Sequence, residues 1–288
     1  MAGMKKPSQL PQSNHEIDHA IEVFVRGFSA CRSVTHPYEC FRVGKVWVTR
    51  DAPRKNPKNY RKEEWIAYGV EPGVVDAAAR QNGQGALPVL PVQPLKRRFF
   101  VCALQALDEP EADLKTAYKA LGYRLLSTEP LFVHDLTTIP RVKVTSGAAG
   151  RRQRVATQNV RIEKVKTPEM AERFGKATRT RPIPAEQLTK DAPFRQYVAL
   201  DGDKIVGWVR SVNACDSTWC HNMYVAASHR RRGIGSALLA RMLRDDRARG
   251  FKKSVLLSSH TGALVYPRVG YTQIGLLYIF APRRSPAS

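Results

Sequence analysis

The chain has 288 residues, 43% of them hydrophobic, and a formal net charge of +22 from 47 Lys and Arg against 25 Asp and Glu residues. This length is enough for one large domain or two of ordinary size, and the absence of a run of 18 apolar residues excludes a membrane span. The N-terminal segment lacks the apolar stretch of a secretory signal, and the five cysteines show no C-x-x-C spacing, so we expect a cytoplasmic protein with no disulfide framework and no metal.

The first half of the chain predicts alternating helices and strands after a tail at residues 1–15. Residues 16–29 predict an amphipathic helix, because Ile17, Ile21, Phe24 and Phe28 recur on one helical face. The elements that follow are expected in this order: strands at 43–49 and 64–70, a Gly- and Pro-rich exposed loop at 82–96, a strand at 97–104, a helix at 111–122 and a two-part strand region at 124–136.

The second half follows a predicted linker at residues 139–158, whose centre is rich in Gly, Ala and Arg. The expected elements are a strand at 160–165, helices at 168–177 and 184–189, strands at 195–200, 204–212 and 217–226, a helix at 233–249, a strand at 254–258, a helix at 261–268, a strand at 271–280 and a tail at 283–288. The Asp201-Gly202-Asp203 segment predicts a hairpin turn. This order predicts an α/β fold in which a mixed, mostly antiparallel central sheet has helices on both faces.

The most informative segment is the turn between the strand at 217–226 and the helix at 233–249. Three arginines, Arg230, Arg231 and Arg232, precede the pair Gly233 and Gly235. Glycine allows a sharp turn and a close backbone approach, and the first amides of a helix together with its macrodipole attract anions. The pattern is neither the dinucleotide fingerprint nor a Walker loop. It predicts a phosphate or pyrophosphate site, and the plainer alternative is an arginine-rich surface turn.

The spacing R-x-x-G-x-G after a strand resembles the acyl-CoA pyrophosphate loop of the GCN5-related N-acetyltransferase (GNAT) family. Downstream, Ala263, Tyr266, Gly270 and Tyr271 match the A-x-x-Y-x-x-x-G-[FY] pattern of that family. The resemblance covers residues 159–282 and implies the acyl-CoA N-acyltransferase fold with acetyl-CoA as the acyl donor. The residues that it implies for binding the donor are Met223, Tyr224, Val225, Arg230, Arg231, Arg232, Gly233, Ile234, Gly235, Ser236 and His260.

The resemblance also implies acid and base residues. Tyr266 matches the tyrosine that faces the CoA sulfur, and it is the candidate general acid. His221 stands where many members carry a carboxylate base, and an imidazole can accept a proton at neutral pH. His260 replaces an asparagine that is usual in the family, and Asp216 is a weaker candidate base. A packing tyrosine and a solvent-facing strand histidine are the plainer alternatives for Tyr266 and His221.

The first half has features of a degenerate second copy of the same fold. Tyr118, Gly122 and Tyr123 repeat the spacing of Tyr266, Gly270 and Tyr271, but the phosphate loop is missing and acidic residues stand near its place. We therefore expect an acetyltransferase-like domain at 16–138 that binds no CoA in the usual way, and a GNAT domain at 159–282. An unrelated α/β domain is the alternative for the first half.

We expect an acetyl-CoA-dependent N-acetyltransferase that acts by direct attack of a primary amine, borne by a small molecule or a protein. The alternative is a non-catalytic CoA-binding or regulatory module. Residues 139–288 hold 28 of the 47 Lys and Arg residues and only 10 of the 25 Asp and Glu residues, so an acidic polymer such as RNA is a possible partner. The identity of the amine and the oligomeric state stay open.

Overall fold

The computed structural model describes residues 14–56, 59–80, 98–109, 113–142, 144 and 160–283. The predicted loop at 82–96 lies outside these ranges, as do most of the tails at 1–15 and 283–288 and most of the linker at 139–158. The elements are α1 (Asn14–Ser33), β1 (Tyr38–Val43), β2 (Val46–Asp51), β3 (Glu63–Tyr68), α2 (Pro72–Arg80), β4 (Phe99–Ala106), α3 (Leu114–Ala120), β5 (Tyr123–His134), β6 (Arg161–Lys164), α4 (Pro168–Thr178), η2 (Ala185–Gln187), β7 (Phe194–Asp201), β8 (Lys204–Ala214), β9 (Ser217–Val225), η3 (Ala227–His229), α5 (Ile234–Ala248), β10 (Ser254–Leu257), η4 (Gly262–Leu264), η5 (Tyr266–Val269) and β11 (Thr272–Pro282).

All eleven strands of the described chain form one sheet in the order β1-β2-β3-β4-β11-β5-β10-β9-β8-β7-β6. The sheet is antiparallel except for the pairs β3–β4 and β9–β10, which are parallel. The predicted mixed, mostly antiparallel sheet is thereby confirmed. None of the helices in the described part of the chain has the length and apolar character needed to cross a bilayer.

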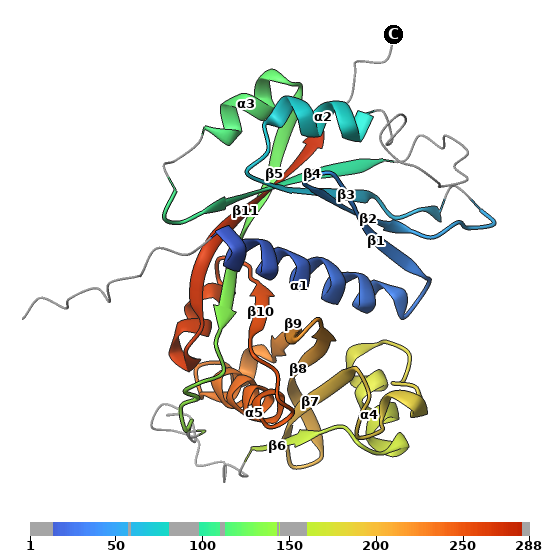
Figure 1. Cartoon of the computed structure of the whole chain (residues 1–288). Coiled ribbons are helices and arrows are strands. Elements are labelled where there is room, and N and C mark those ends of the chain that lie inside the picture. The colour runs from blue at the N-terminus through green and yellow to red at the C-terminus, as the bar shows by residue number, and fades with distance from the viewer. Residues whose placement is uncertain are drawn as a thin grey trace, which may run out of the picture.

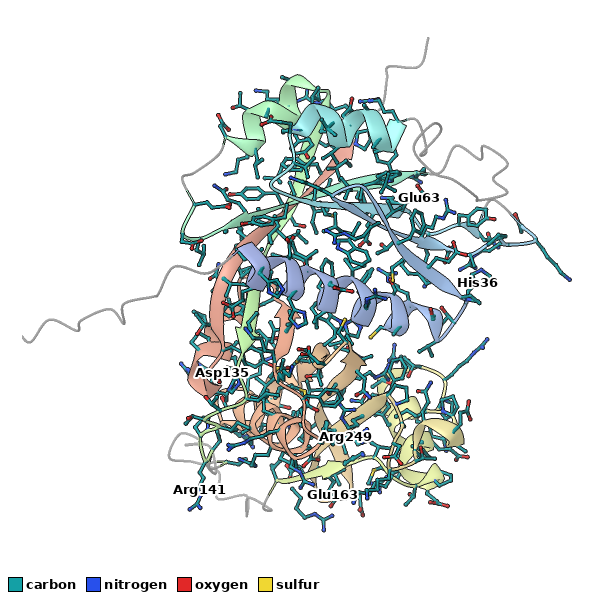
Figure 2. All side chains as sticks on the ribbon, viewed as in Figure 1. His36, Glu63, Asp135, Arg141, Glu163 and Arg249 are labelled. Atoms are coloured by element: carbon teal, nitrogen blue, oxygen red, sulfur yellow. The ribbon has the colours of Figure 1, made fainter. Side chains whose placement is uncertain are left out.

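The pairing pattern is symmetric about the central pair β11–β5. On one side, β11 pairs antiparallel with β4, and β4 pairs parallel with β3. On the other side, β5 pairs antiparallel with β10, and β10 pairs parallel with β9. The strands beyond β3 and β9 are antiparallel on both sides. The last strand of the chain thus pairs with the first half, and β5 of the first half pairs with β10 of the second. Figure 1 shows β5 and β11 running between the two parts of the molecule, and Figure 2 places Asp135, just after β5, in the lower part, away from Glu63 in the upper strands.

Helices cover both faces of this sheet, as the sequence predicts. One face packs on α1, through Ile17, Ile21 and Phe24, and on α4. The other face packs on α5 in the second half and on α2 and α3 in the first half. Helix α1 crosses the middle of the molecule and contacts strands of both halves, namely β1, β2, β8, β9 and β10 (Figure 1).

Four local predictions need correction. The expected strand at 43–49 is the hairpin β1–β2, because Gly44 takes φ +59° and Val43 pairs with Val46 across a two-residue turn. The expected helix at 261–268 is two short 3-10 helices, since Pro267 lacks an amide hydrogen and its ring would clash with an α-helical backbone. The helix at 184–189 is only the single turn η2, and the two-part region at 124–136 is the continuous strand β5.

A buried ion pair fixes the C-terminal end of α5 to the sheet. The Arg195 guanidinium on β7 donates to Asp246 of α5 at 2.9 Å, and both side chains are almost fully buried. Ser211 of β8 and Thr218 of β9 also donate to this carboxylate, each at 2.9 Å. Such a network stabilises a buried charge only when its hydrogen bonds are complete, so the position of α5 against β7, β8 and β9 is tightly defined.

Candidate active site

The central feature of the site is the divergence of β9 from β10. The two strands pair only at Thr218–Ser254 and Trp219–Val255. Beyond this point Leu256 and Leu257 continue pairing with β5 instead. A cavity of about 710 Å³ occupies the divergence, between the end of β9, the start of α5 and the segment that follows β10.

One end of this cavity is the turn into α5. Gly233 caps the helix with φ +76°, a conformation that glycine adopts without strain. The first amides of the helix, from Ile234 to Ser236, have no intrahelical acceptor and line the cavity with Arg230 and Arg231. Amides and guanidinium groups in this arrangement form an anion site.

Two contacts hold this turn against β9. The Nε of Arg230 donates to the carbonyl oxygen of Val225 at 3.0 Å. Gly235 lies so close to β9 that a Cβ atom there would stand 2.7 Å from Cε of Met223. The turn therefore places the backbone of the helix start directly beside the end of β9.

Strand β9 is irregular where it borders the cavity. Its register with β8 shifts between the pairs Trp208–Tyr224 and Arg210–His221, and Asn222 in the bulge takes φ +53°. A bulge re-aims side chains and interrupts ladder bonding. The backbone from Asn222 to Val225 thereby becomes the wall of the cavity.

The other end of the cavity is formed by Tyr266 and the segment after β10. Tyr266 is mostly buried, its ring contacts Phe132 and Tyr271, and burial raises the pKa of its phenol above the usual range. A Cβ atom on Gly262 would lie 3.7 Å from Cε2 of Tyr266 and 3.2 Å from Oγ of Ser258, so these two side chains are neighbours. A phenol with a raised pKa is protonated at neutral pH, so Tyr266 holds a proton to donate, and burial makes it a weaker acid than an exposed tyrosine.

His221 lines the same cavity on β9. Burial and the positive charges of Arg210 and Arg32 lower its pKa to about 4. The imidazole is therefore neutral at pH 7, and it is a weaker base than an exposed histidine.

Most of the predicted donor-binding residues come together here. Met223, Tyr224, Val225, Arg230, Arg231, Gly233, Ile234, Gly235 and Ser236 line the cavity, and Arg232 and His260 do not. The His260 ring instead lies 2.7 Å from Oγ1 of Thr128 on β5. Asp216 is also remote, because it pairs with Lys252 and His19 at the other end of β9.

The sequence reasoning missed the hydroxyl-bearing segment at 258–261. Ser258, Ser259 and Thr261 line the cavity, and Oγ of Ser259 accepts the amide of Gly262 at 3.2 Å. The sequence S-S-H-T-G after a buried strand could have indicated this segment, because serine and threonine hydroxyls often bond to nearby backbone amides.

All five cysteines are free thiols, and Cys220, beside the site, is buried.

This combination of a mixed sheet, two diverging parallel strands and a helix start facing the gap defines the acyl-CoA N-acyltransferase class. Residues 193–273 match the family model of the acetyltransferase (GNAT) domain, which identifies this part of the chain as an acetyltransferase domain. The resemblance drawn from residues 230–235 and 263–271 is confirmed. GNAT domains use acetyl-CoA as donor.

Solved structures support the same fold over nearly the whole chain. A GCN5-related N-acetyltransferase from Kribbella flavida is 15% identical, with a TM-score of 0.58, over 92% of this chain and 96% of that one. A functionally unknown conserved protein from Staphylococcus epidermidis is 14% identical, with a TM-score of 0.50, over 86% and 95% of the two chains. The search of curated protein sequences gives no match.

Proposed function

We propose that the chain is an acetyl-CoA-dependent N-acetyltransferase in which a primary amine attacks the thioester directly. The observation that carries the proposal is the cavity between β9 and β10, with an anion-binding helix start at one end and Tyr266 at the other. Its volume of about 710 Å³ suits a large ligand such as a nucleotide-linked thioester, whose pyrophosphate would contact the amides of residues 234–236. The pantetheine arm would lie along the backbone of residues 222–225.

Each polar group that lines the cavity would act in one step of the acyl transfer. The amine nitrogen forms a bond to the thioester carbon, and a β9 amide near Met223 or Val225 stabilises the oxygen as negative charge develops. The C–S bond then breaks, and the Tyr266 hydroxyl donates a proton to the leaving sulfur. The neutral His221 ring, at the acceptor side of the cavity, orients the incoming amine by a hydrogen bond.

The test is release of CoA thiol from acetyl-CoA with a panel of amines. We expect Tyr266→Phe to lower kcat by about 10²–10⁴-fold, the usual contribution of a general acid. Tyr118→Phe is the matched control, because Tyr118 holds the corresponding position in the first half and its buried hydroxyl has no hydrogen-bond partner among the described residues. Equal rates for the two variants would refute the role of Tyr266, and CoA binding without turnover of any amine would favour a regulatory module.

A second candidate function, binding of an acidic polymer such as RNA, is favoured by one observation. A groove of about 950 Å³ at the start of β3, β4 and β5 is lined by the aromatic rings of Phe99 and Phe100 and by four cations, Lys62, Arg98, Arg124 and Arg283. Cations beside aromatic rings suit a single-stranded nucleic acid. A labelled RNA oligonucleotide should then bind with an affinity that falls steeply with salt, and a flat salt dependence would remove this candidate.

A further inference from the structure

A second cavity, which we call the α1 chamber, adjoins the donor cavity. It has a volume of about 370 Å³ and lies between α1 and the face of the sheet that α1 covers. Its walls come from both halves of the chain, because β3, β4, β5 and β11 meet β9 and β10 here. The volume falls within the range of small-molecule sites.

The α1 chamber meets the donor cavity at the point where the reaction would take place. Trp219, His221, Leu257, Ser258 and Ser259 line both cavities. Ser258 is also the neighbour of Tyr266, through the turn at Gly262. A molecule in the chamber would therefore reach the acyl end of the donor and not its nucleotide end.

Two carboxylates from the first half enter the chamber, Glu64 on β3 and Glu129 on β5. Among the residues that the structure describes, neither side chain has a hydrogen bond or an ion pair. Burial raises the pKa of Glu64 to about 7. The positive charge of Arg32 acts to lower this pKa, and the negative charge of Glu129 acts to raise it. Burial also raises the pKa of Glu129. Two half-buried carboxylates side by side carry more negative charge than the single guanidinium of Arg32 offsets, and this favours a bound cation.

The remaining walls of the chamber are largely aromatic. Phe24 and Phe28 of α1, Phe100 of β4 and Trp219 of β9 surround it, and the Phe24 and Trp219 ring centroids lie 5.2 Å apart. The only cation that lines the chamber within the described chain, Arg32, has its guanidinium 4.8 Å from the centroid of the Phe28 ring and is exposed at the rim. Aromatic faces attract both apolar groups and organic cations.

Resting on the proposed function, we infer that the α1 chamber is the acceptor site, and that it takes a compact monoamine with an apolar or aromatic body. Glu64 binds the ammonium group and removes its proton. Glu129 holds the cation beside it, and the aromatic walls enclose the rest of the molecule. The first half of the chain thereby supplies the acceptor site for a donor site in the second half.

The proton balance is complete with these groups. The ammonium loses one proton to the Glu64 carboxylate, and the neutral nitrogen then bonds to the thioester carbon. The tetrahedral intermediate then loses a second proton from nitrogen as the C–S bond breaks. The sulfur receives a proton from Tyr266, and the proton lost from nitrogen restores the Tyr266 hydroxyl. The products are the amide, the CoA thiol and one proton released to solvent from Glu64. A carboxylate with a pKa near 7 is a much stronger base than an ordinary glutamate.

The first experiment measures binding, which does not depend on turnover. The full-length protein, loaded with CoA, is titrated with 2-phenylethylamine and with the neutral analogue 2-phenylethanol in a calorimeter. We expect the amine to bind at one site at least 10-fold more tightly than the alcohol, and Glu64→Gln together with Glu129→Gln to weaken the amine at least 10-fold. Glu71→Gln, an exposed glutamate of the same half, serves as the control and should bind as the wild type does.

The second experiment follows kcat/KM for this amine against pH. The titratable and charged groups near Glu64 are Arg32 on α1, Tyr38 on β1, Cys102 on β4, Glu129 on β5 and His221 on β9. We expect kcat/KM to rise with pH through about 7 in the wild type, and Glu64→Gln to lose that rise and at least 100-fold in rate at pH 7.

The outcomes separate the two proposals. If the protein binds CoA but not the amine, or if the double variant and the wild type bind the amine equally, the proposed acceptor site is wrong and the proposed donor site is unaffected. Failure of CoA itself to bind overturns the proposed function, and the acceptor site with it. Tighter binding of spermidine than of 2-phenylethylamine would also contradict a chamber for a compact monoamine.

Discussion

Replacing Glu64 by glutamine should stabilise the fold while it removes activity. The folded chain holds the pKa of Glu64 near 7, against an ordinary value of 4.5, so the native state binds this proton more tightly than the unfolded state does. Stability therefore falls as pH rises from about 4.5 through 7. With 1.36 kcal/mol for each pKa unit, the raised pKa of Glu64 lowers the free energy of unfolding by about 3 kcal/mol at pH 8 and by about 1 kcal/mol at pH 5, relative to low pH where both states are protonated. Glutamine has nearly the same shape and carries no charge at either pH.

The assay is urea denaturation of wild type, Glu64→Gln and the control Glu71→Gln at both pH values. We expect the free energy of unfolding of Glu64→Gln to be higher than that of the wild type, and this gain to be about 2 kcal/mol larger at pH 8 than at pH 5. The exposed control Glu71→Gln should show no such dependence on pH. A destabilised active site of this kind is a common basis for the trade-off between stability and activity. If Glu64→Gln and wild type differ equally at the two pH values, Glu64 titrates as an exposed carboxylate and our assignment of its proton fails.

Two further predictions concern packing around the site. Asp246→Asn leaves the buried Arg195 charge without its partner, so we expect the free energy of unfolding to fall by about 3–5 kcal/mol in urea denaturation, and a loss below 1 kcal/mol would contradict the role of this pair in holding α5. Gly27→Ala would place a Cβ atom 2.2 Å from Cβ of Trp219. We expect it to separate α1 from β9 at a cost of about 1–3 kcal/mol, whereas Gly73→Ala in α2, where an added Cβ meets nothing within 4 Å, should be neutral or stabilising.

The turn and helix start at one end of the cavity could be predicted from the sequence because their determinants are local. The turn from Arg230 to Gly235 and the start of α5 are set by glycine conformation and helix capping within a few residues. The confirmed hairpin between β7 and β8 also depends only on the Asp201-Gly202-Asp203 turn and the register of its strands. At Pro267 the family motif misled us, because it was given more weight than the helix-breaking residue.

The acceptor side could not be predicted because it depends on strand order. Nothing local in residues 272–282 indicates that β11 pairs with β4, or that β5 inserts between β11 and β10. Without that order Glu64 and Glu129 are ordinary strand residues of the first half. The lowered pKa of His221 could not be predicted from the sequence either, since it comes first from burial and then from the charges of Arg210 and Arg32, which the fold brings near the ring.

The claim on which the account depends is that the amides at the start of α5 bind the pyrophosphate of CoA, and titration calorimetry tests it directly. Gly235→Asp adds a carboxylate at the second residue of α5, where it repels an anionic ligand. Gly235→Asn is the control, because it adds a Cβ atom at the same place, 2.7 Å from Cε of Met223, without the charge. We predict that the wild type binds CoA and that Gly235→Asp binds it at least 100-fold more weakly than Gly235→Asn does; no binding by the wild type, or equal binding by all three, would contradict the claim.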